Sequence, residues 1–569
     1  MKKSLHFPRL ALLAITLMLA ASSAMAYDIE VDGIYYTVSS GRAYVTYKDD
    51  NFNSYSGDVV IPAQFTHDGQ TYTVLEIWDY AFLQCENLTS VTIPSTVTKV
   101  GNTAFKRCPK LNRVTIPSSV TQIGNYAFTQ CASLASIVIP NSVNKLGFSA
   151  FEECTALSSV TLSNQLEVIE PLTFYGCTSL KNVTIPASVK TIDDQAFEYS
   201  GLERVTLSSG LTTIGNYAFR RCENLNKVTI PNTVTTIGNE TFRECTNLKS
   251  VTLSSSLETM GQGAFRQSGL ESIAIPNSVK AIGETAFYEC LALEEAIIGD
   301  GVKEIGEYAF YRCLELATLT LGNHLETIHN DAFKGCNKLA AVNIPNSVIT
   351  LEDEAFSYCH ALQSVVIGNG VKTIGNYAFH ECEEMSNLII GNNVTSIGSN
   401  AFYSCQALKR VDIPNSVETI GNCAFLHCQG LTVVNIGSGV KTIGYGAFVG
   451  VWQLASMTCR ATTPPTCVIN DSWNTFSTNV YEVATLYVPQ ESISKYKNAE
   501  IWKNFFNIKA ILDHIPGDVN IDGEVNIADV NAVIDNILSN SHNTQGDVNG
   551  DGEVNIADVN AVIDIILKH

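Results

Sequence analysis

Two segments near the C-terminus carry oxygen-bearing side chains at one common spacing. Residues 518–529 read D-V-N-I-D-G-E-V-N-I-A-D, and residues 547–558 repeat that order with Gly550 in place of Ile521. Asp or Asn stands at positions 1, 3, 5, 9 and 12 of each segment, and glycine stands at position 6. This pattern is typical of a calcium-binding loop, in which hard oxygen ligands surround the ion and the glycine permits a sharp turn.

We therefore predict two Ca²⁺ ions, one in each loop. Three carboxylates per loop supply the charge that the ion needs, and position 7 adds its backbone carbonyl. An acidic tail rich in turns is the alternative, and it accounts less well for two near-identical copies 29 residues apart. The predicted ligands are Asp518, Asn520, Asp522, Glu524, Asn526 and Asp529 in the first loop, and Asp547, Asn549, Asp551, Glu553, Asn555 and Asp558 in the second.

Each loop leads into a segment with helical periodicity. Apolar residues recur there at steps of three and four, which predicts one apolar helix face after each loop. No entering helix is indicated before either loop, so each unit corresponds to half an EF-hand. The apolar positions are Val530, Val533, Ile534, Ile537 and Leu538 after the first loop, and Val559, Val562, Ile563, Ile566 and Leu567 after the second.

Two loop–helix units with Asp rather than Glu at loop position 12 resemble a type I dockerin over residues 518–569. The resemblance implies a calcium-dependent fold and binding to a cohesin domain on a scaffold or surface protein. It also implies that loop positions 10 and 11 contact the partner. These are Ile527 and Ala528 in the first unit and Ile556 and Ala557 in the second, whereas many family members carry hydroxyls there.

One phrase recurs along most of the chain before these loops, with the form L-x-x-V-x-I-P-x-x-V-x-x-I-G-x-x-A-F-x-x-C. The step is 23 residues, apart from two steps of 22. A fixed period of this length predicts a solenoid, in which each coil buries its apolar edge against its neighbours. The seventeen repeated phenylalanines are Phe82, Phe105, Phe128, Phe151, Phe174, Phe197, Phe219, Phe242, Phe265, Phe287, Phe310, Phe333, Phe356, Phe379, Phe402, Phe425 and Phe448.

Within each coil, L-x-x-V-x-I fits the strand template of leucine-rich repeats, and the following proline ends the strand. The second apolar pair begins the return leg, and glycine permits a tight turn into a single helical turn that carries Ala and Phe. The outward strand position is mostly Thr, which suits an exposed strand without any binding role. At about 4.8 Å per coil, seventeen coils span roughly 80 Å.

Fourteen of the 17 cysteines occupy one repeat position, from Cys85 to Cys428. Stacked coils place them about 4.8 Å apart and parallel, which suits disulfides poorly and predicts a column of buried free thiols. A ladder of soft metal ions is the alternative. Ser200 and Ser268 replace cysteine in the two coils that precede the shorter steps. Cys459 and Cys467 flank two prolines, and a local disulfide between them is left open.

The repeats resemble the BspA-like leucine-rich repeat family of bacterial surface proteins. The phrases I-G-N-Y-A-F at 123–128 and V-T-I-P at 228–231 carry that match, which extends over about 82–448. The resemblance implies extracellular adhesion or ligand binding, with a host protein or a glycan as ligand of the solenoid.

The ends of the chain suggest export and capping. Lys2, Lys3 and Arg9 precede an apolar run that ends in Ala24-Met25-Ala26, the pattern of a secretory signal peptide. We predict a signal peptide at 1–26, a β-rich N-terminal cap at 27–75, the solenoid at 76–451, a small α/β C-terminal cap at 452–513 and the helical dockerin-like domain at 514–569. Within the caps we expect strands at 34–38, 43–47 and 485–488 and a helix near 492–506.

Composition excludes some functions. Lys+Arg 35 against Asp+Glu 56 gives a net charge of −21, which argues against nucleic-acid binding and against docking on anionic lipid. No later membrane span is evident, and no catalytic motif or carboxylate pair stands out. The sequence thus favours a secreted or cell-surface, non-catalytic binding protein. The alternative is an accessory component of an extracellular polysaccharide-degrading complex.

Overall fold

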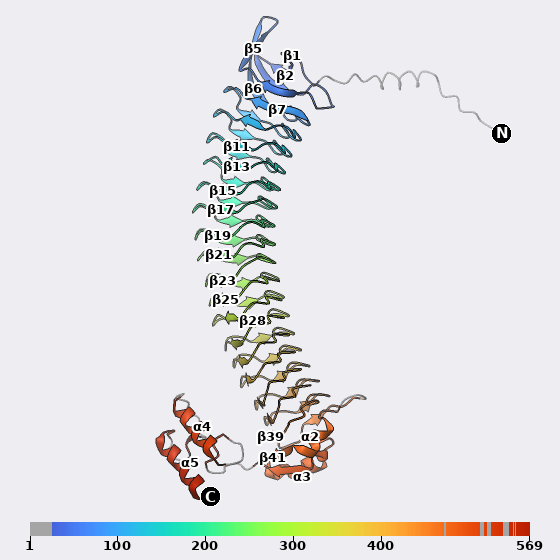
Figure 1. Cartoon of the computed structure of the whole chain (residues 1–569), viewed down its shortest axis with the longest axis vertical. Coiled ribbons are helices and arrows are strands. Elements are labelled where there is room, and N and C mark those ends of the chain that lie inside the picture. Colours follow the sequence, from blue (N-terminus) through green and yellow to red (C-terminus); the bar gives the residue numbers. More distant parts are fainter. Residues whose placement is uncertain are drawn as a thin grey trace, which may run out of the picture.

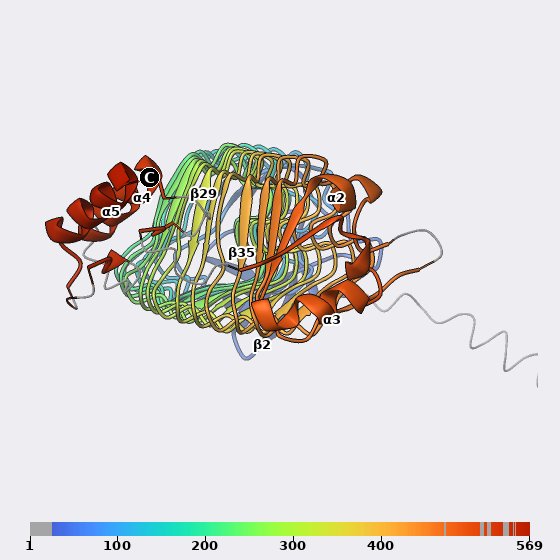
Figure 2. The same cartoon turned by 90° about the horizontal axis from the view of Figure 1, so that it is seen from below.

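The computed structural model describes residues 26–470, 474–511, 517–520, 525–538, 546–549, 551 and 553–568. The predicted signal peptide therefore lies outside the described residues, except for Ala26. Figure 1 shows the coils stacked into a long, gently curved column, and Figure 2 shows, nearly end-on, that successive coils follow the same path. The chain forms a parallel β-solenoid of about 19 turns. The predicted leucine-rich-repeat fold is confirmed.

The L-x-x-V-x-I segments form the strands of one face of the solenoid. They pair in parallel and in register, as Ser136 does with Ser159. Their bounds are β7 Asn87–Thr92, β9 Arg113–Thr115, β11 Ser136–Val138, β13 Ser159–Thr161, β15 Asn182–Thr184, β17 Arg204–Thr206, β19 Lys227–Thr229, β21 Ser250–Thr252, β23 Ser272–Ile275, β25 Glu295–Ile298, β27 Thr318–Thr320, β29 Ala341–Ile344, β31 Ser364–Ile367, β33 Asn387–Ile389, β35 Arg410–Ile413, β37 Val433–Ile436 and β39 Ser456–Cys459.

Short strands just before the repeated glycine form a second face, again parallel and in register, as between Gln122 and Lys145. Their bounds are β8 Lys99–Val100, β10 Gln122–Ile123, β12 Lys145–Leu146, β14 Val168–Ile169, β16 Thr191–Ile192, β18 Thr213–Ile214, β20 Thr236–Ile237, β22 Thr259–Met260, β24 Ala281–Ile282, β26 Glu304–Ile305, β28 Thr327–Ile328, β30 Thr350–Leu351, β32 Thr373–Ile374, β34 Ser396–Ile397, β36 Thr419–Ile420, β38 Thr442–Ile443 and β40 Thr466–Cys467.

The third side of each coil carries Ala and Phe, and it differs from the single helical turn that we expected. It is a run of turns in which every second N–H donates to the next coil, as from Phe82 to the Ala104 carbonyl at 2.7 Å. The intervening N–H groups donate three residues back, as from Leu83 to Tyr80 at 2.9 Å. Positive φ angles recur in each run, at 60° for Thr103 and 59° for Arg107. Pairing between coils therefore replaces the helix.

The repeated phenylalanines stack in the solenoid interior. Consecutive rings lie nearly parallel, with centroids 4.7 Å apart for Phe82 and Phe105 and 5.6 Å apart for Phe151 and Phe174. The stack continues beyond the repeat at both ends, through Tyr55 and through Phe476. These two rings belong to coils without the sequence phrase, which is why the solenoid has more turns than the repeated phenylalanines indicate.

The cysteine column is confirmed as free thiols. All 17 cysteines are unpaired, and the fourteen in the column are buried. Along the column a thiol donates to the phenylalanine carbonyl of the preceding coil, as Cys131 does to Phe105 at 3.1 Å. Cys459 and Cys467 form no disulfide, because β39 and β40 lie in different sheets of the same coil.

The two shorter coils show why serine accompanies the missing residue. Ser200 lies 3.3 Å from the Cys222 sulfur and so continues the column. A Cβ added to Gly201 would lie 1.9 Å from the Thr178 carbonyl oxygen, which only glycine avoids. Gly269 repeats this close approach beside Ser268, at 2.1 Å from the Thr246 carbonyl oxygen.

The N-terminal cap covers the first coil. Strands β1 Ile29–Val31, β2 Ile34–Ser39 and β3 Arg42–Thr46 pair antiparallel, so the expected strands are present. Strand β4 Ser56–Val60 pairs with β7, and β5 Gln64–His67 pairs with β6 Gln70–Ile77. Since β6 lies between β3 and β8, the cap continues the second face of the solenoid.

The C-terminal cap closes the other end. It contains α2 Thr478–Val483, β41 Thr485–Val488, η1 Gln490–Ser492, α3 Ile493–Asn498, η2 Trp502–Asn504 and β42 Asn507–Ala510. The expected strand at 485–488 is present. The helix expected near 492–506 ends at Asn498, since Ile501 has a φ of 71° and the chain then enters β42, which pairs with β41.

Two helices follow the loops of the C-terminal module: α4 Ile527–Leu538 and α5 Ile556–Lys568. Their core is a cluster of five buried valines, Val519, Val530, Val533, Val559 and Val562. Ile534 and Leu538, which we expected on the packed face, are exposed, Leu538 by 78%. Ile537 and Ile566, also on the predicted apolar faces, are partly buried and pack against the valines.

Candidate functional site

The C-terminal module is the candidate metal centre, and the last residue of each loop organises it. Asp529 and Asp558 are fully buried. One oxygen of Asp558 accepts the N–H groups of Val548 and Asn549 at 2.8 and 3.1 Å, and the other accepts that of Asn555 at 2.9 Å. The carboxylate thus ties the start of the loop to the start of α5.

The first loop repeats this arrangement. Asp529 accepts the N–H groups of Val519 and Asn520 at 2.7 and 3.0 Å, and that of Asn526 at 2.9 Å. In turn, the Asn526 side-chain oxygen accepts the N–H of Ala528 at 2.8 Å. This reciprocal pair is a capping box at the helix start, built from Asn and Asp. It explains why a polar residue recurs at positions 9 and 12.

Oxygens from the beginning of the second loop gather at one point. The Asp551 N–H donates to the Asp547 carboxylate at 3.0 Å and to the Asn549 side-chain oxygen at 2.8 Å. Two oxygens that share one donor lie close together, as ligands of a single ion must. The Glu553 N–H donates to the Asp551 carboxylate at 2.9 Å, which curls the loop further around the same region.

These donors fit calcium, which takes carboxylate and amide oxygens from a loop of this curvature. Asp547, Asn549, Asp551, Glu553, Asn555 and Asp558 all belong to this loop. Asp518, Asn520, Asn526 and Asp529 take the matching places in the first loop, while Asp522 and Glu524 lie outside the described residues. The ligand assignment itself remains a prediction.

The residues expected to contact a partner lie on the module surface. Ile527 and Ile556 are 69% and 68% exposed, and Ala528 and Ala557 are exposed beside them. The first helix carries two further exposed apolar side chains, Ile534 and Leu538, and the second carries their counterparts Ile563 and Leu567. Sequence reasoning missed these four, although their steps of seven and eleven from each isoleucine place them along the same side of the helix.

Adjacent coils of the solenoid bring together one cluster that the sequence analysis did not single out. His360, Glu381 and Glu383 offer ligand atoms that all lie within 4.8 Å of one another. Glu381 and Glu383 follow His360 by 21 and 23 residues, so the coil period itself places them beside it. Imidazole and carboxylate ligands suit divalent transition metals rather than calcium.

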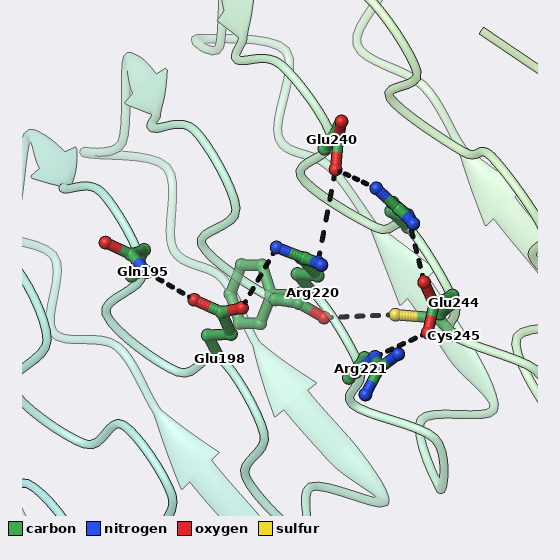
Figure 3. A network of polar contacts seen from close by, with 9 residues as sticks. Gln195, Glu198, Arg220, Arg221, Glu240, Glu244 and Cys245 are labelled. Carbon is green, nitrogen blue, oxygen red and sulfur yellow. Dashed lines mark hydrogen bonds and ion pairs between the residues drawn. The ribbon is translucent and has the colours of Figure 1, made fainter. Parts of the chain in front are cut away.

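A network of charged side chains links neighbouring coils at the turn side (Figure 3). Buried Glu198 accepts a hydrogen bond from Gln195 at 2.6 Å and lies 3.5 Å from the Arg220 guanidinium. Burial raises the pKa of Glu198. Arg220 and Arg243 both contact Glu240, and Arg243 and Arg221 both contact Glu244. These three glutamates are thus paired with arginines, an arrangement that stabilises coil stacking.

In the part of the chain that the structure describes, no helix combines the length and the apolarity that crossing a membrane requires.

Comparison with known families identifies both parts of the chain. The C-terminal residues 516–567 match the Dockerin type I domain, a family known to bind calcium and cohesin domains. Both the dockerin and the leucine-rich repeat families are non-enzymatic, and their members are typically extracellular or on the cell surface. No curated protein matches the chain.

Solved structures of bacterial leucine-rich repeat proteins are similar to this chain. A leucine-rich repeat protein from Bacteroides ovatus is 27% identical, with 76% of this chain and 94% of that chain covered and a TM-score of 0.44. A leucine-rich cell surface protein from Faecalibacterium prausnitzii is 26% identical, with 77% and 95% covered and a TM-score of 0.27.

A leucine-rich repeat protein from T. pallidum is 28% identical, with 39% of this chain and 91% of that chain covered and a TM-score of 0.30. The family description that matches most of the chain is the BspA type leucine-rich repeat region, over residues 75–203, 169–294, 260–382 and 350–466. The chain therefore belongs to the BspA-type leucine-rich repeat family and carries a C-terminal dockerin type I domain.

Proposed function

We propose that this chain is an exported, non-catalytic binding protein with two separate tasks. The solenoid presents a ligand-binding surface, and the dockerin module, loaded with two calcium ions, attaches the chain to a cohesin-bearing partner. The signal sequence predicted at 1–26 supports export. The ligand of the solenoid belongs to the host-protein or glycan class.

The single observation that supports the attachment role is the arrangement of side chains at each loop–helix junction. A buried aspartate fixes the junction, and the isoleucine and alanine beside it stand exposed at the helix start. Apolar side chains exposed at a fixed point favour burial in a protein interface, because that removes their surface from water. Two near-identical junctions allow the partner to bind in either of two orientations.

The test is capture of the purified chain on an immobilised panel of type I cohesin domains, with calcium or with a chelator. We expect capture by at least one cohesin in calcium and none in chelator. The double variant Ile527→Asp/Ile556→Asp should lose capture, since both orientations then bury a charge. The matched control is Ile349→Asp, which alters an isoleucine of the solenoid that is 54% exposed, and it should be captured normally. Equal capture of both variants would contradict the assignment.

A further inference from the structure

A hollow of about 430 Å³ lies beside the N-terminal cap, where β3, β6 and β8 run side by side. Three aromatic residues, Tyr47, Trp78 and Tyr80, and three charged residues, Glu76, Asp79 and Lys99, contribute to its lining. Hollows of this volume hold small-molecule ligands in many proteins. It lies in the cap and first coils, apart from the calcium module.

The Trp78 and Tyr80 rings in this hollow are exposed, and neighbouring aromatic rings pack against them. Trp78 is 37% exposed and Tyr80 is 44% exposed. The Trp78 indole stacks on Tyr44, with centroids 4.9 Å apart and an interplanar angle of 28°. Phe52 packs against both Tyr80 and Tyr47, with centroids 6.0 and 4.9 Å apart. Rings held in this way bind a ligand with little loss of side-chain freedom.

The backbone explains why such a large side chain stands here. Trp78 occupies the place of Gly101, Gly124 and Gly147 in the next three coils, where an added Cβ would lie 2.4 to 2.5 Å from the backbone of the preceding coil. At Trp78 the preceding segment is strand β3, whose Val45 carbonyl accepts the Trp78 N–H at 2.9 Å. The first coil can therefore present a tryptophan where these coils require glycine.

Two of the three charged side chains of the hollow make no contact that the fold uses. Glu76 on β6 and Lys99 on β8 stand opposite each other in the strand register. Among the described residues, neither side chain has a hydrogen bond or an ion pair. The neighbouring Asp79 carboxylate, in contrast, is occupied by the backbone and side-chain N–H groups of Asn102, at 2.7 and 3.0 Å. One acceptor and one donor thus remain beside two exposed rings.

We propose that this hollow binds an uncharged oligosaccharide. A sugar ring has an apolar C–H face that packs on an aromatic ring, and its hydroxyls both donate, as Glu76 requires, and accept, as Lys99 requires. Acidic sugars fit less well, because Glu76 and Asp79 outnumber Lys99 and the whole chain carries a net charge of −21. The proposal rests on the ligand-binding role proposed for the solenoid and assigns a chemical class to its ligand.

The experiment uses the mature chain beginning at Tyr27, which lacks the Ala26 that lines one side of the hollow. The chain is titrated with uncharged hexasaccharides of glucose, mannose, galactose and xylose, and with trigalacturonic acid and a heparin oligosaccharide as charged counterparts. Tryptophan fluorescence and calorimetry report binding. We expect at least one uncharged hexasaccharide to bind and to change the emission of Trp78, and the acidic sugars not to bind.

Trp78→Ala should weaken that binding by about tenfold, the worth of one stacked ring. The matched control is Trp452→Ala, which removes a tryptophan that is 56% exposed at the other end of the repeat, and its affinity should equal that of the unaltered chain. Glu76→Gln removes no hydrogen bond or ion pair that stabilises the fold, and it should also weaken sugar binding. Thermal unfolding of each variant verifies that the cap remains folded.

Three results would overturn the proposal: no uncharged sugar binds, the acidic sugars bind instead, or Trp78→Ala and Glu76→Gln leave the affinity unchanged. The same samples are passed over immobilised cohesin in calcium. If the chain is retained there but binds no sugar, the proposed sugar site is refuted and the attachment role stands. If the chain binds sugar but is not retained, the attachment role is refuted and the proposed sugar site stands.

Discussion

The solenoid and the C-terminal module are stabilised in opposite ways. In the solenoid, each coil donates backbone N–H groups to the next and buries a phenylalanine between two others, as Phe105 lies between Phe82 and Phe128. The module buries five valines and uses two aspartates to fix its loops. Repetition supplies a core to the first region, whereas the second is so small that we expect metal binding to contribute to its folding.

The largest expected effect comes from removing calcium. We expect a chelator to unfold the helices α4 and α5 and to leave the strand signal of the solenoid unchanged, because five valines do not offset the conformational entropy of about fifty residues. Far-ultraviolet circular dichroism and hydrogen exchange measure both regions in one sample. Calorimetry should count two calcium ions per chain.

A pair of variants refines this test within one helix. Asp558→Asn replaces one of the two oxygens that accept backbone N–H groups by an NH₂ donor and removes the charge of a predicted ligand, and it should lower the number of bound ions from two to one. Asp564→Asn changes an exposed aspartate of α5 and should bind two ions. Unfolding of the solenoid together with the module, or survival of the module in chelator, would show that the two regions are not stabilised separately.

Alkaline pH should destabilise the solenoid. Burial raises the pKa of Cys131, Cys177 and Cys222 to about 12, from an ordinary value of 9. Below pH 9 these thiols are protonated in the folded and the unfolded chain, and their contribution is fully present. Between pH 9 and 12 only the unfolded chain loses the protons, so stability falls with rising pH, by up to about 4 kcal/mol for each such thiol.

We therefore expect the solenoid to unfold between pH 9 and 12, as followed by circular dichroism. The last cysteine is Cys467, so the module has no thiol that adds to this effect. At neutral pH a thiol reagent should reach Cys423 and Cys467, which are partly exposed, before the buried column. Rapid labelling of the whole column in the folded chain, or a solenoid that persists at pH 12, would contradict the assigned burial.

The solenoid could be predicted from the sequence because its signal is repeated. Seventeen copies of one phrase average out local ambiguity, and the buried places of Phe, Ala and Cys follow from the period alone. The turn side could not be predicted in this way. The spacing from Gly101 to Cys108 fits a helical turn, yet the N–H of Phe105 donates to Ala127 in the next coil. A partner 22 residues away is not visible in the local pattern.

The loops of the module and the hollow at Trp78 also differ in how far apart their residues lie in the sequence. The dockerin module could be predicted because the oxygen-bearing residues of each loop lie within twelve residues of one another, where spacing determines geometry; their role as calcium ligands stays a prediction. The hollow at Trp78 could not, since its lining residues come from the cap and the first coils and lie far apart in the sequence. Ile534 and Leu538 show a related limit, because apolar periodicity does not distinguish a packed side chain from one that awaits a partner.

The smallest expected effect concerns the asparagines that join coils. The Asn369 side-chain oxygen accepts the backbone N–H of Asn392 at 2.7 Å. The backbone N–H of Asn369 donates to the Asn346 side-chain oxygen at 2.8 Å. Asn369→Ala should lower the free energy of unfolding by about 1 kcal/mol, since one N–H loses its acceptor. Asn343→Ala is the matched control, because this exposed asparagine of β29 has no such bond among the described residues, and it should change stability by less than about 0.5 kcal/mol. Coils contact only their neighbours, so calcium binding by the module should be the same in both variants. Equal denaturant unfolding of the two variants would mean that the asparagines do not contribute to coil stacking, and that backbone pairing and apolar packing alone stabilise the solenoid, without the bound ion that we expect in the module.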